Sequence, residues 1–343
     1  MPTVTLQPSG HVFQVEEGEA VLTAALRQGY ILPYGCKNGA CGSCKGKIIS
    51  GSVDYGVYQE KALPAAEREA GKALFCQAKP LGDLVIEART VGAAKDIPVR
   101  TLPCRVQKVE RVTDDVVILF LKLPANERLL FLAGQYIEFL LKDRSRRSFS
   151  MANAPHDDEL VQLHIRHVAG GSFTDHVFSK MKERDILRFE GPLGTFFLRE
   201  DSPKPIVFVA SGTGFAPIKS IFEYALNKGI ARPMTLYWGG RRPRDLYLND
   251  LALKWAAENA GFKYVPVISE ALPEDQWTGR TGFVHRAVME DFPDLSEHQV
   301  YACGVPIMVD SAKRDFLAQC KLPEEEFFAD SFTTQADIPQ SPK

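Results

Sequence analysis

The sequence predicts a multidomain protein that combines α+β and α/β architecture in one chain. Three observations lead to this prediction: a Gly/Cys-rich loop within the first 90 residues, a series of short strand-like runs over residues 102–199, and strands that alternate with helices from residue 205 onward. Short strands separated by turn signals favour an antiparallel β-barrel. Alternating strands and helices favour a Rossmann-like, doubly wound parallel sheet. We therefore expect three folding units of different class.

The predicted boundaries follow these changes of pattern. The first unit covers residues 1–90, a linker 91–101, the barrel 102–199, the doubly wound unit 200–335 and a tail 336–343. The linker is small and polar and contains Pro98, as expected of a connection between domains. The length of 343 residues is in the range of two or three domains.

Composition and charge argue against several classes of protein. Hydrophobic residues make up 45% of the chain and charged residues 24%, and the formal net charge is -2. No basic face for nucleic acid is indicated, no run reaches the roughly 18 apolar residues of a membrane span, and the first residues lack a signal-peptide pattern. We expect a cytoplasmic protein that has no membrane span and binds no nucleic acid. No hydrophobic stripe requires a dimer, and a monomer is slightly favoured.

The first unit begins with the pattern of a β-hairpin. Two apolar runs, residues 4–6 and 12–15, flank a Pro-Ser-Gly turn at 8–10. Apolar residues at helical spacing follow at 21–26 and predict a helix. The Gly/Cys-rich loop, residues 35–46, comes directly after it.

Four cysteines form the strongest signal in the sequence. Cys36, Cys41 and Cys44 stand in the pattern C-x4-C-x2-C, and Cys76 follows at a distance. This is the spacing of plant-type 2Fe-2S sites, in which one loop wraps its thiolates around two irons. A zinc site usually pairs two short C-x2-C hooks, and this loop has one. We interpret the four thiols as iron ligands, whereas seven cysteines in all are too few for a disulfide scaffold.

Two segments of the barrel unit contain residue types that suit a flavin. Residues 147–150 (R-S-F-S) offer a cation for a phosphate, a ring that can stack on a flat ring system, and a hydroxyl for its edge. Residues 170–172 (G-G-S) precede a predicted helix over 173–180, whose first N–H groups can bind a pyrophosphate. Each segment alone has an ordinary interpretation as a chance match or a turn.

The doubly wound unit contains a candidate nucleotide loop. Residues 212–217 (G-T-G-F-A-P) lie between a predicted strand, 206–210, and a predicted helix, 218–226. The glycines let the chain turn tightly and approach a dinucleotide phosphate. Residues 239–242 (G-G-R-R) follow the next predicted strand and lack the usual ribose-binding acid.

Arg241 and Arg242 leave the choice of nucleotide open. An arginine at this place can favour the 2′-phosphate of NADP, but both side chains can equally be solvated surface. Cys303 and Gly304 close a later predicted strand, 299–302. There they can face a bound ligand, or Cys303 can simply be a small buried thiol. No histidine with a clear orienting partner indicates a nucleophilic role for Cys303.

Taken together, the three units resemble the ferredoxin–NADP reductase superfamily, in the class with an N-terminal plant-type ferredoxin domain. The resemblance covers nearly the whole chain and is strongest with CDP-6-deoxy-delta-3,4-glucoseen reductases and reductase components of oxygenases. Its motifs are residues 133–136 (A-G-Q-Y), 147–150, with Phe in place of the family's Tyr, 191–194 (G-P-L-G), interpreted as a connecting loop, 212–217, and 303–308 (C-G-V-P-I-M). It implies a β-grasp ferredoxin domain, an antiparallel β-barrel for FAD and a Rossmann-like nucleotide domain.

The resemblance also implies a set of site residues. The set expected at FAD or the nicotinamide nucleotide is Arg147, Ser148, Phe149, Ser150, His164, Arg166, Gly170, Gly171, Ser172, Gly212, Thr213, Gly214, Pro217, Arg241, Cys303, Gly304 and Phe332. Ser150 and Cys303 are expected to take part in catalysis. Phe332 ends an aromatic segment, 327–332, of the kind that approaches the flavin in some relatives.

The implied function is an NAD(P)H-dependent oxidoreductase. Electrons are expected to pass from NADH, with NADPH possible, through FAD and the 2Fe-2S cluster to a separate protein, such as an oxygenase, a monooxygenase or a deoxysugar dehydrase component. Two alternatives stay open. One is a reductase of free flavin or another small acceptor that does not need the cluster, and the other is a non-catalytic redox-sensing or electron-storage subunit.

Overall fold

The computed structural model describes residues 1–89, 91, 97–334 and 337. The chain forms two compact units, one of Met1–Pro98 with Ser331–Lys343 and one of Val99–Asp330. Residues 92–96 of the predicted linker and all of the predicted tail except residue 337 lie outside the described residues. No helix of the described residues is long and apolar enough to cross a membrane.

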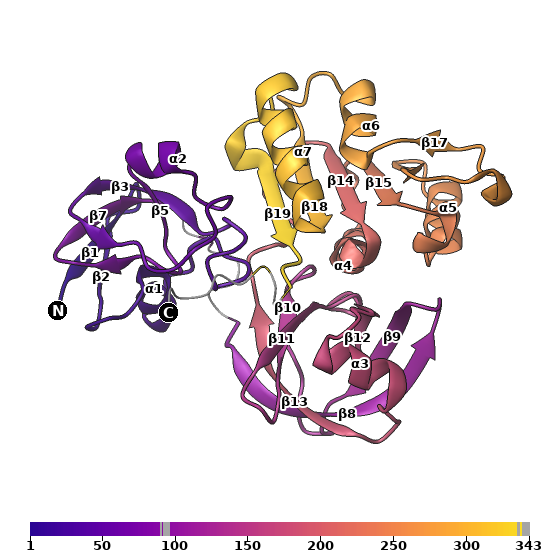
Figure 1. Cartoon of the computed structure of the whole chain (residues 1–343), viewed down its shortest axis with the longest axis horizontal. Coiled ribbons are helices and arrows are strands. Elements are labelled where there is room, and N and C mark those ends of the chain that lie inside the picture. Colours follow the sequence, from indigo (N-terminus) through magenta and orange to yellow (C-terminus); the bar gives the residue numbers. More distant parts are fainter. Residues whose placement is uncertain (90, 92–96, 335–336, 338–343) are drawn as a thin grey trace. The chain divides into compact units, whose positions relative to one another are not determined.

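The first unit is built on a five-stranded sheet in the order β2-β1-β7-β3-β5 (Figure 1). Strand β1 pairs in parallel with β7, and the other neighbouring strands run antiparallel. The predicted hairpin and helix are confirmed as β1, β2 and α1. The elements are β1 (Thr3–Gln7), β2 (His11–Gln14), α1 (Val21–Arg27), β3 (Lys45–Ser50), β4 (Val53–Asp54), α2 (Ala65–Glu69), β5 (Lys72–Leu74), β6 (Lys79–Pro80) and β7 (Leu84–Glu87).

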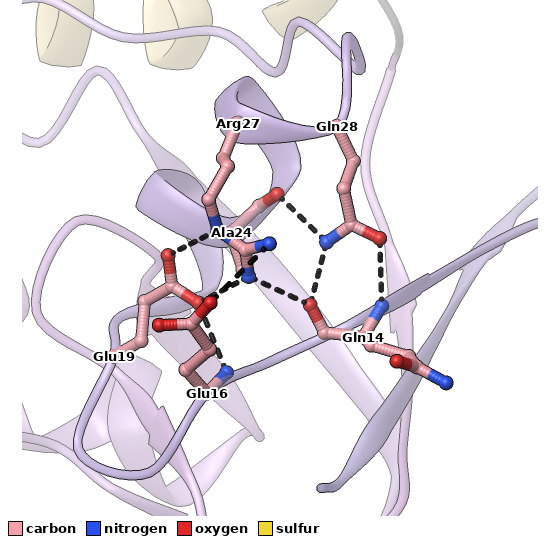
Figure 2. A network of polar contacts seen from close by, with 6 residues as sticks. All are labelled: Gln14, Glu16, Glu19, Ala24, Arg27 and Gln28. Carbon is pink, nitrogen blue, oxygen red and sulfur yellow. Dashed lines mark hydrogen bonds and ion pairs between the residues drawn. The ribbon is translucent and has the colours of Figure 1, made fainter.

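Polar contacts fix the C-terminal end of α1 to strand β2 (Figure 2). Arg27 donates hydrogen bonds to both carboxylate oxygens of Glu19, at 3.0 and 2.7 Å, and to the Gln14 carbonyl at 3.2 Å. Gln28 donates to the same carbonyl at 2.6 Å and accepts from the Gln14 N–H at 3.1 Å. Because these contacts are exposed, each contributes little stability, but together they orient the helix that precedes the cysteine-bearing loop.

The second unit begins with an antiparallel six-stranded sheet in the order β11-β10-β13-β8-β9-β12. A bridge between Met151 and Leu163 and a 2.8 Å bond from the Ala152 N–H to the Gln162 carbonyl join its two edges, so the sheet closes into the predicted barrel. Its elements are β8 (Arg100–Arg111), β9 (Val116–Lys122), β10 (Tyr136–Leu140), β11 (Arg146–Ser150), β12 (Val161–Arg166), α3 (Ser172–Ser179) and β13 (Ile186–Leu193).

The segment 191–194 differs from its expected form. Instead of a connecting loop, residues 191–193 are the end of strand β13, because Gly191 pairs with Arg100 and Leu193 pairs with Tyr136. Glycine is required at 191, since a Cβ there would lie 2.9 Å from the Ile137 side chain. The connection to the next sheet starts only after this strand.

The same unit continues with a six-stranded sheet in the order β17-β16-β15-β14-β18-β19, parallel from β17 to β18. The chain moves outward from β14 through β15 and β16 to β17 and then crosses to β18, so the point where the order reverses lies between β14 and β18. Edge strand β19 was not expected. The elements are β14 (Ile206–Ser211), η2 (Gly212–Gly214), α4 (Phe215–Asn227), β15 (Met234–Gly240), η3 (Pro243–Asp245), α5 (Asn249–Glu258), β16 (Phe262–Ile268), η4 (Pro273–Asp275), β17 (Arg280–Thr281), α6 (Val284–Asp291), β18 (Gln299–Gly304), α7 (Pro306–Gln319), η5 (Glu324–Glu326) and β19 (Phe327–Ser331).

Candidate functional site

The cysteine loop connects α1 to β3 and packs against the segment that follows β5. Cys44 and Cys76 are buried, and Cys36 and Cys41 are half-buried. The N–H of Leu22, in the first turn of α1, donates to the Phe75 carbonyl at 2.8 Å. The helix thus holds the chain beside Cys76, the distant member of the set, next to the loop.

The four thiols lie in two pairs. The pKa of Cys41 is lowered to about 6, first because the Cys36 thiol donates a hydrogen bond to it. In the second pair, the Cys44 thiol donates a hydrogen bond to Cys76, and this bond is the first cause of the lowered Cys76 pKa. The same bonds, followed by burial, raise the pKa of Cys36 and Cys44.

This arrangement fits a two-iron group with two thiolates on each iron. Among the described residues, no group of three or more His, Cys, Asp or Glu side chains is arranged around a single metal ion. The Cys36 N–H points to the Cys41 sulfur at 3.4 Å, and the Ser43 hydroxyl oxygen lies at 3.4 Å from the same sulfur. Hydrogen bonds to ligand sulfurs tune such groups.

The loop needs glycine at Gly39, whose φ is +79°. A Cβ at this position would lie 2.8 Å from the Val57 carbonyl oxygen, so no other residue fits without displacing the neighbouring backbone. Of the lysines in and after the loop, Lys45 forms an ion pair with Glu67, which offsets its charge.

The flavin-type motif lies on β11, at the edge of the barrel sheet. Arg147 is half-exposed, donates to the Arg146 carbonyl at 2.7 Å and makes no ion pair among the described residues. Ser148 is exposed and donates to Glu138 at 3.2 Å. Phe149 packs one side of its ring against the core and remains half-exposed, so part of its surface is available to a planar ligand.

The two predicted pyrophosphate elements lie on the same side of the barrel. The rings of Phe149, on β11, and Phe173, in the first turn of α3, have centroids 5.5 Å apart. Gly171 immediately precedes α3, and no side chain caps the helix. A Cβ at Gly171 would lie 2.8 Å from the Thr174 hydroxyl, whereas Gly170 is open and has a φ of +76°. The first N–H groups of α3 therefore lack helical partners. These N–H groups, and the Arg147 guanidinium on the neighbouring Phe149 strand, fit a pyrophosphate.

The predicted catalytic residues Ser150 and Cys303 meet at a carboxylate that the sequence did not indicate. Ser150 donates to Asp330 at 3.1 Å, and the Cys303 sulfur lies 3.9 Å from the same oxygen. Burial, followed by the charge of Asp330, raises the pKa of the Cys303 thiol. The thiol therefore stays protonated, in agreement with the absence of a nucleophilic role.

The nucleotide loop packs directly on the end of β18. A Cβ at Gly214 would lie 2.1 Å from the Cys303 carbonyl oxygen, and one at Gly304 would lie 2.2 Å from the Ser211 hydroxyl. Both glycines are thus required by the close approach of the loops after β14 and β18, at the point where the strand order reverses. Gly212 has a φ of +53° and faces the Arg166 side chain.

Arg166 presents a partly unpaired guanidinium at this loop. One of its terminal nitrogens bonds Asp115 at 2.7 Å and lies 3.7 Å from Asp245. Its Nε and Nη2 atoms are buried and lack a hydrogen-bond partner among the described residues. Buried donors of a charged group are normally satisfied, so a phosphate at the Gly212 turn fits these atoms.

His164 lies in a buried network of hydrogen bonds, outside the flavin motif at residues 147–150. It is buried, and its ring bonds the Tyr247 hydroxyl through Nδ1 at 2.8 Å and the Gln162 side-chain nitrogen through Nε2 at 3.2 Å. The Gln162 side-chain oxygen accepts from Lys219 at 3.3 Å. Since Gln162 donates to Nε2, the imidazole proton sits on Nδ1 and is donated to Tyr247. His164 thus contacts Tyr247 directly and is linked to Lys219 through Gln162, and the sequence indicated neither of these nucleotide-domain residues.

Replacing His164 with glutamine is expected to reduce the sensitivity of the fold to acid. Burial, then the charge of Lys219, holds the pKa of His164 well below its ordinary 6.5. The unfolded chain takes up a proton below pH 6.5 that the folded chain does not, so stability present above that pH is lost as pH falls, by at most about 1.4 kcal/mol per pH unit. Thermal unfolding from pH 7.5 to 5.5 should show a smaller decrease for His164→Gln than for the wild type.

The control for this prediction is the exposed His156, also in the barrel unit. A His156→Gln variant should lose stability with pH as the wild type does. An unchanged decrease in His164→Gln would show that His164 is not the group that responds.

The remaining predicted residues occupy varied positions. Thr213 is half-exposed in η2, while Pro217 is buried in the first turn of α4, where a proline starts a helix without loss of a bond. The Arg241 N–H donates to Asp245 at 2.8 Å, and its side chain is exposed. Phe332 is half-buried and follows β19 directly.

Three segments of the chain match known families of domains. Residues 4–81 match the 2Fe-2S iron-sulfur cluster binding domain, residues 103–198 the oxidoreductase FAD-binding domain, and residues 208–314 the oxidoreductase NAD-binding domain. These matches confirm the three predicted binding functions, for a 2Fe-2S cluster, FAD and a nicotinamide nucleotide.

Relatives share the whole architecture. The chain is 42% identical over 329 residues to the CDP-6-deoxy-L-threo-D-glycero-4-hexulose-3-dehydrase reductase of Yersinia pseudotuberculosis serotype I (strain IP32953), covering 96% of this chain and 98% of that protein. It is 37% identical over 339 residues to the phenol 2-monooxygenase reductase component DmpP of Pseudomonas sp. (strain CF600), covering 97% and 95%. The crystal structure of the Amycolatopsis cytochrome P450 reductase GcoB has a TM-score of 0.77 at 34% identity, covering 97% of this chain and 99% of that one.

Proposed function

We propose that this chain, which belongs to the ferredoxin–NADP reductase superfamily in the class with an N-terminal plant-type ferredoxin domain, oxidises NADH and delivers the electrons to a protein acceptor. The matched 2Fe-2S, FAD-binding and NAD-binding domains, together with relatives named as reductases, support NAD(P)H-dependent electron transfer to a partner. The observation that carries the proposal is the meeting of Ser150, from the FAD-binding barrel, with Cys303, from the nucleotide-binding sheet, at Asp330.

The proposed acceptor is an oxygenase or a sugar dehydrase component. One relative is named as the reductase of a hexulose dehydrase and another as a component of a monooxygenase. The proposed location is the cytoplasm. All seven cysteines are free thiols, as expected in a reducing compartment. The monomeric state remains a prediction.

The roles that we propose for the residues follow from their surroundings. Bound FAD supplies hydride acceptance and the cluster supplies single-electron transfer. Arg147 and the N–H groups at Gly171 and Ser172 bind the FAD pyrophosphate. Phe149 supports the flavin ring with its exposed surface. Arg166 binds the nucleotide phosphate at the Gly212 turn, because its unpaired donors face that turn.

Anaerobic titration of the purified holoprotein with NADH, followed by visible spectroscopy, tests the function. Flavin and cluster bands should bleach together, to about three electrons per chain, two on the flavin and one on the cluster. Bleaching of the flavin alone would instead favour direct reduction of a small acceptor. No bleaching by either NADH or NADPH would favour a non-catalytic subunit.

Replacing Asp330 with asparagine is expected to slow flavin reduction by NADH by about 10- to 100-fold. The carboxylate accepts a hydrogen bond from the Ser150 hydroxyl and faces the Cys303 thiol, so we propose that it orients both groups at the flavin and nicotinamide rings. Rapid-mixing absorbance of the anaerobic holoprotein measures the rate. Flavin content should stay at the wild-type level, because asparagine keeps the shape of the side chain.

The exposed Asp250→Asn substitution on α5 is the matched control for Asp330→Asn. It should leave the rate unchanged. If NADH reduced the flavin of Asp330→Asn at the wild-type rate, Asp330 would have no role in this reaction.

A further inference from the structure

Three arginines follow strand β15, at the position where a doubly wound sheet approaches the ribose of a dinucleotide. In a doubly wound sheet, the nucleotide lies across the carboxyl ends of the strands at the point where their order reverses, and the second strand approaches the adenosine ribose. Arg241, Arg242 and Arg244 come directly after β15. An arginine there is the residue type that accepts the 2′-phosphate of NADPH, so the state of these side chains bears on the choice of nucleotide.

Arg242 is already engaged by two carboxylates from the next loop. Its Nε donates to Asp275 at 2.5 Å, its Nη2 donates to the other oxygen of Asp275 at 2.8 Å, and Nη2 also reaches Glu274 at 3.3 Å. The two-point contact with Asp275 is the geometry in which an arginine binds a carboxylate most strongly. We call Arg242, Glu274 and Asp275 the carboxylate clamp.

The backbone holds the clamp in place on both sides. The N–H groups of Arg241 and Arg242 donate to Asp245 at 2.8 and 3.0 Å, which fixes the turn after β15. Asp275 also accepts from the Leu272 N–H at 2.9 Å, which fixes its carboxylate within its own turn. The Arg242 and Asp275 side chains are 24% and 15% exposed, so the contact is only partly shielded from water.

The summed charge of the loops after β15 and β16 is unfavourable for a phosphate. The loop after β15 contributes Asp245 and the loop after β16 contributes Glu270, Glu274 and Asp275, four acids against the three arginines. The loops lie side by side, since the Glu270 N–H donates to the Arg241 carbonyl at 2.9 Å. A 2′-phosphate entering here meets loops with one more acid than arginines, and an Arg242 whose Nε and Nη2 atoms already donate to carboxylates.

We propose that the carboxylate clamp makes the nucleotide site select NADH, by withholding Arg242 from the 2′-phosphate of NADPH. The inference rests on the proposed NADH oxidation and names the residues that set its specificity. Arg241 and Arg244 are exposed, and Asp245 and Glu270 of the same two loops balance their two charges. Neutralising the clamp frees Arg242 for the phosphate.

Binding of 2′,5′-ADP and 5′-ADP to the holoprotein, measured by calorimetry, tests the clamp without any turnover. The wild type should bind 2′,5′-ADP more weakly than 5′-ADP. Asp275→Asn should bind 2′,5′-ADP about tenfold more tightly, the effect of one charge-assisted hydrogen bond, and Glu274→Gln/Asp275→Asn more tightly still. Adding Arg242→Ala to Asp275→Asn should remove the gain in 2′,5′-ADP affinity.

The variants are chosen to preserve the fold. The amide oxygen that Asp275→Asn introduces can still accept from the Leu272 N–H, so the turn should persist. Glu274→Gln alone is a milder second variant.

Steady-state oxidation of NADH and NADPH with ferricyanide gives the second measurement. The ratio of kcat/KM for NADPH to that for NADH should rise about tenfold in Asp275→Asn and stay at the wild-type value in Glu258→Gln, an exposed control on α5. Unchanged 2′,5′-ADP binding in Asp275→Asn and in the double variant, or a wild type that binds 2′,5′-ADP more tightly than 5′-ADP, would overturn the proposal. A wild type that oxidises neither nucleotide would instead contradict the proposed function, and the binding data would still decide the clamp.

Discussion

A Cys41→Ser variant should lose at least about 100-fold of its NADH-dependent reduction of cytochrome c, a protein acceptor, while keeping the reduction of ferricyanide. Cys41 has the lowered pKa of its pair and lies against both Cys36 and Ser43. A serine hydroxyl stays protonated and is a poor ligand for iron, and even the loss of groups around a metal ligand costs 10- to 100-fold. Ferricyanide is a small anion that can take electrons at the flavin itself, so its reduction should not require the cluster.

The measurement compares both acceptors in the variant and the wild type, with the cluster followed by its visible bands. Cys104→Ala is the matched control, because Cys104 is a buried thiol of the barrel whose pKa burial raises to about 12. It should keep both activities. If Cys41→Ser lost its cluster bands and still reduced cytochrome c at the wild-type rate, the cluster would not lie on the electron path, and a small-acceptor reductase would become the better interpretation.

A Gly214→Ala variant should lower kcat/KM for NADH by at least about 100-fold and destabilise the nucleotide-binding domain by more than about 3 kcal/mol. The added methyl would lie 2.1 Å from the Cys303 carbonyl oxygen and 2.8 Å from the Gly304 nitrogen, both backbone atoms that no rotamer change can move away. The loop must therefore separate from the end of β18. Displacements of about 1 Å in an active site are enough for a loss of this size.

Gly261→Ala provides the control in the same domain, since a Cβ at Gly261 has no neighbour within 4 Å. Its unfolding temperature and NADH kinetics should match the wild type. Flavin spectra should stay normal in both variants, because the barrel binds FAD separately. A Gly214→Ala protein with wild-type kinetics would mean that the loops after β14 and β18 are not held together as described.

The sequence predicted what depends on local spacing. The cysteine pattern, the hairpin and helix before it, the strands of the barrel and the glycine loop at 212–214 all come from residues close together in the chain, so periodicity and turn chemistry suffice to find them. The paired thiols of the structure are the four cysteines that this spacing predicted, three in one loop and Cys76 at a distance.

Contacts between distant segments could not be predicted in this way. Asp330 lies 180 residues after Ser150, in an edge strand that the polar and aromatic residues around it did not indicate. His164 belongs to the face of β12 that alternation alone would assign to solvent, but Lys219 and Tyr247 cover it. The clamp at Arg242 likewise needs a register between two loops that only the parallel pairing of β15 and β16 supplies. In each case tertiary packing, and not a motif, assigns the role.

The pairing of the four thiols also has a consequence for the folding stability of the first unit. One pair, Cys36 with Cys41, is local, whereas the other joins Cys44 to a residue 32 positions later in the chain. A bound cluster therefore acts as a cross-link across β3, β4, α2 and β5. By the loop-closure estimate used for disulfides, restraining a segment of that length is worth roughly 3–4 kcal/mol. A bound cluster therefore also stabilises the fold of this unit, and its loss would destabilise the surface from which we expect electrons to leave.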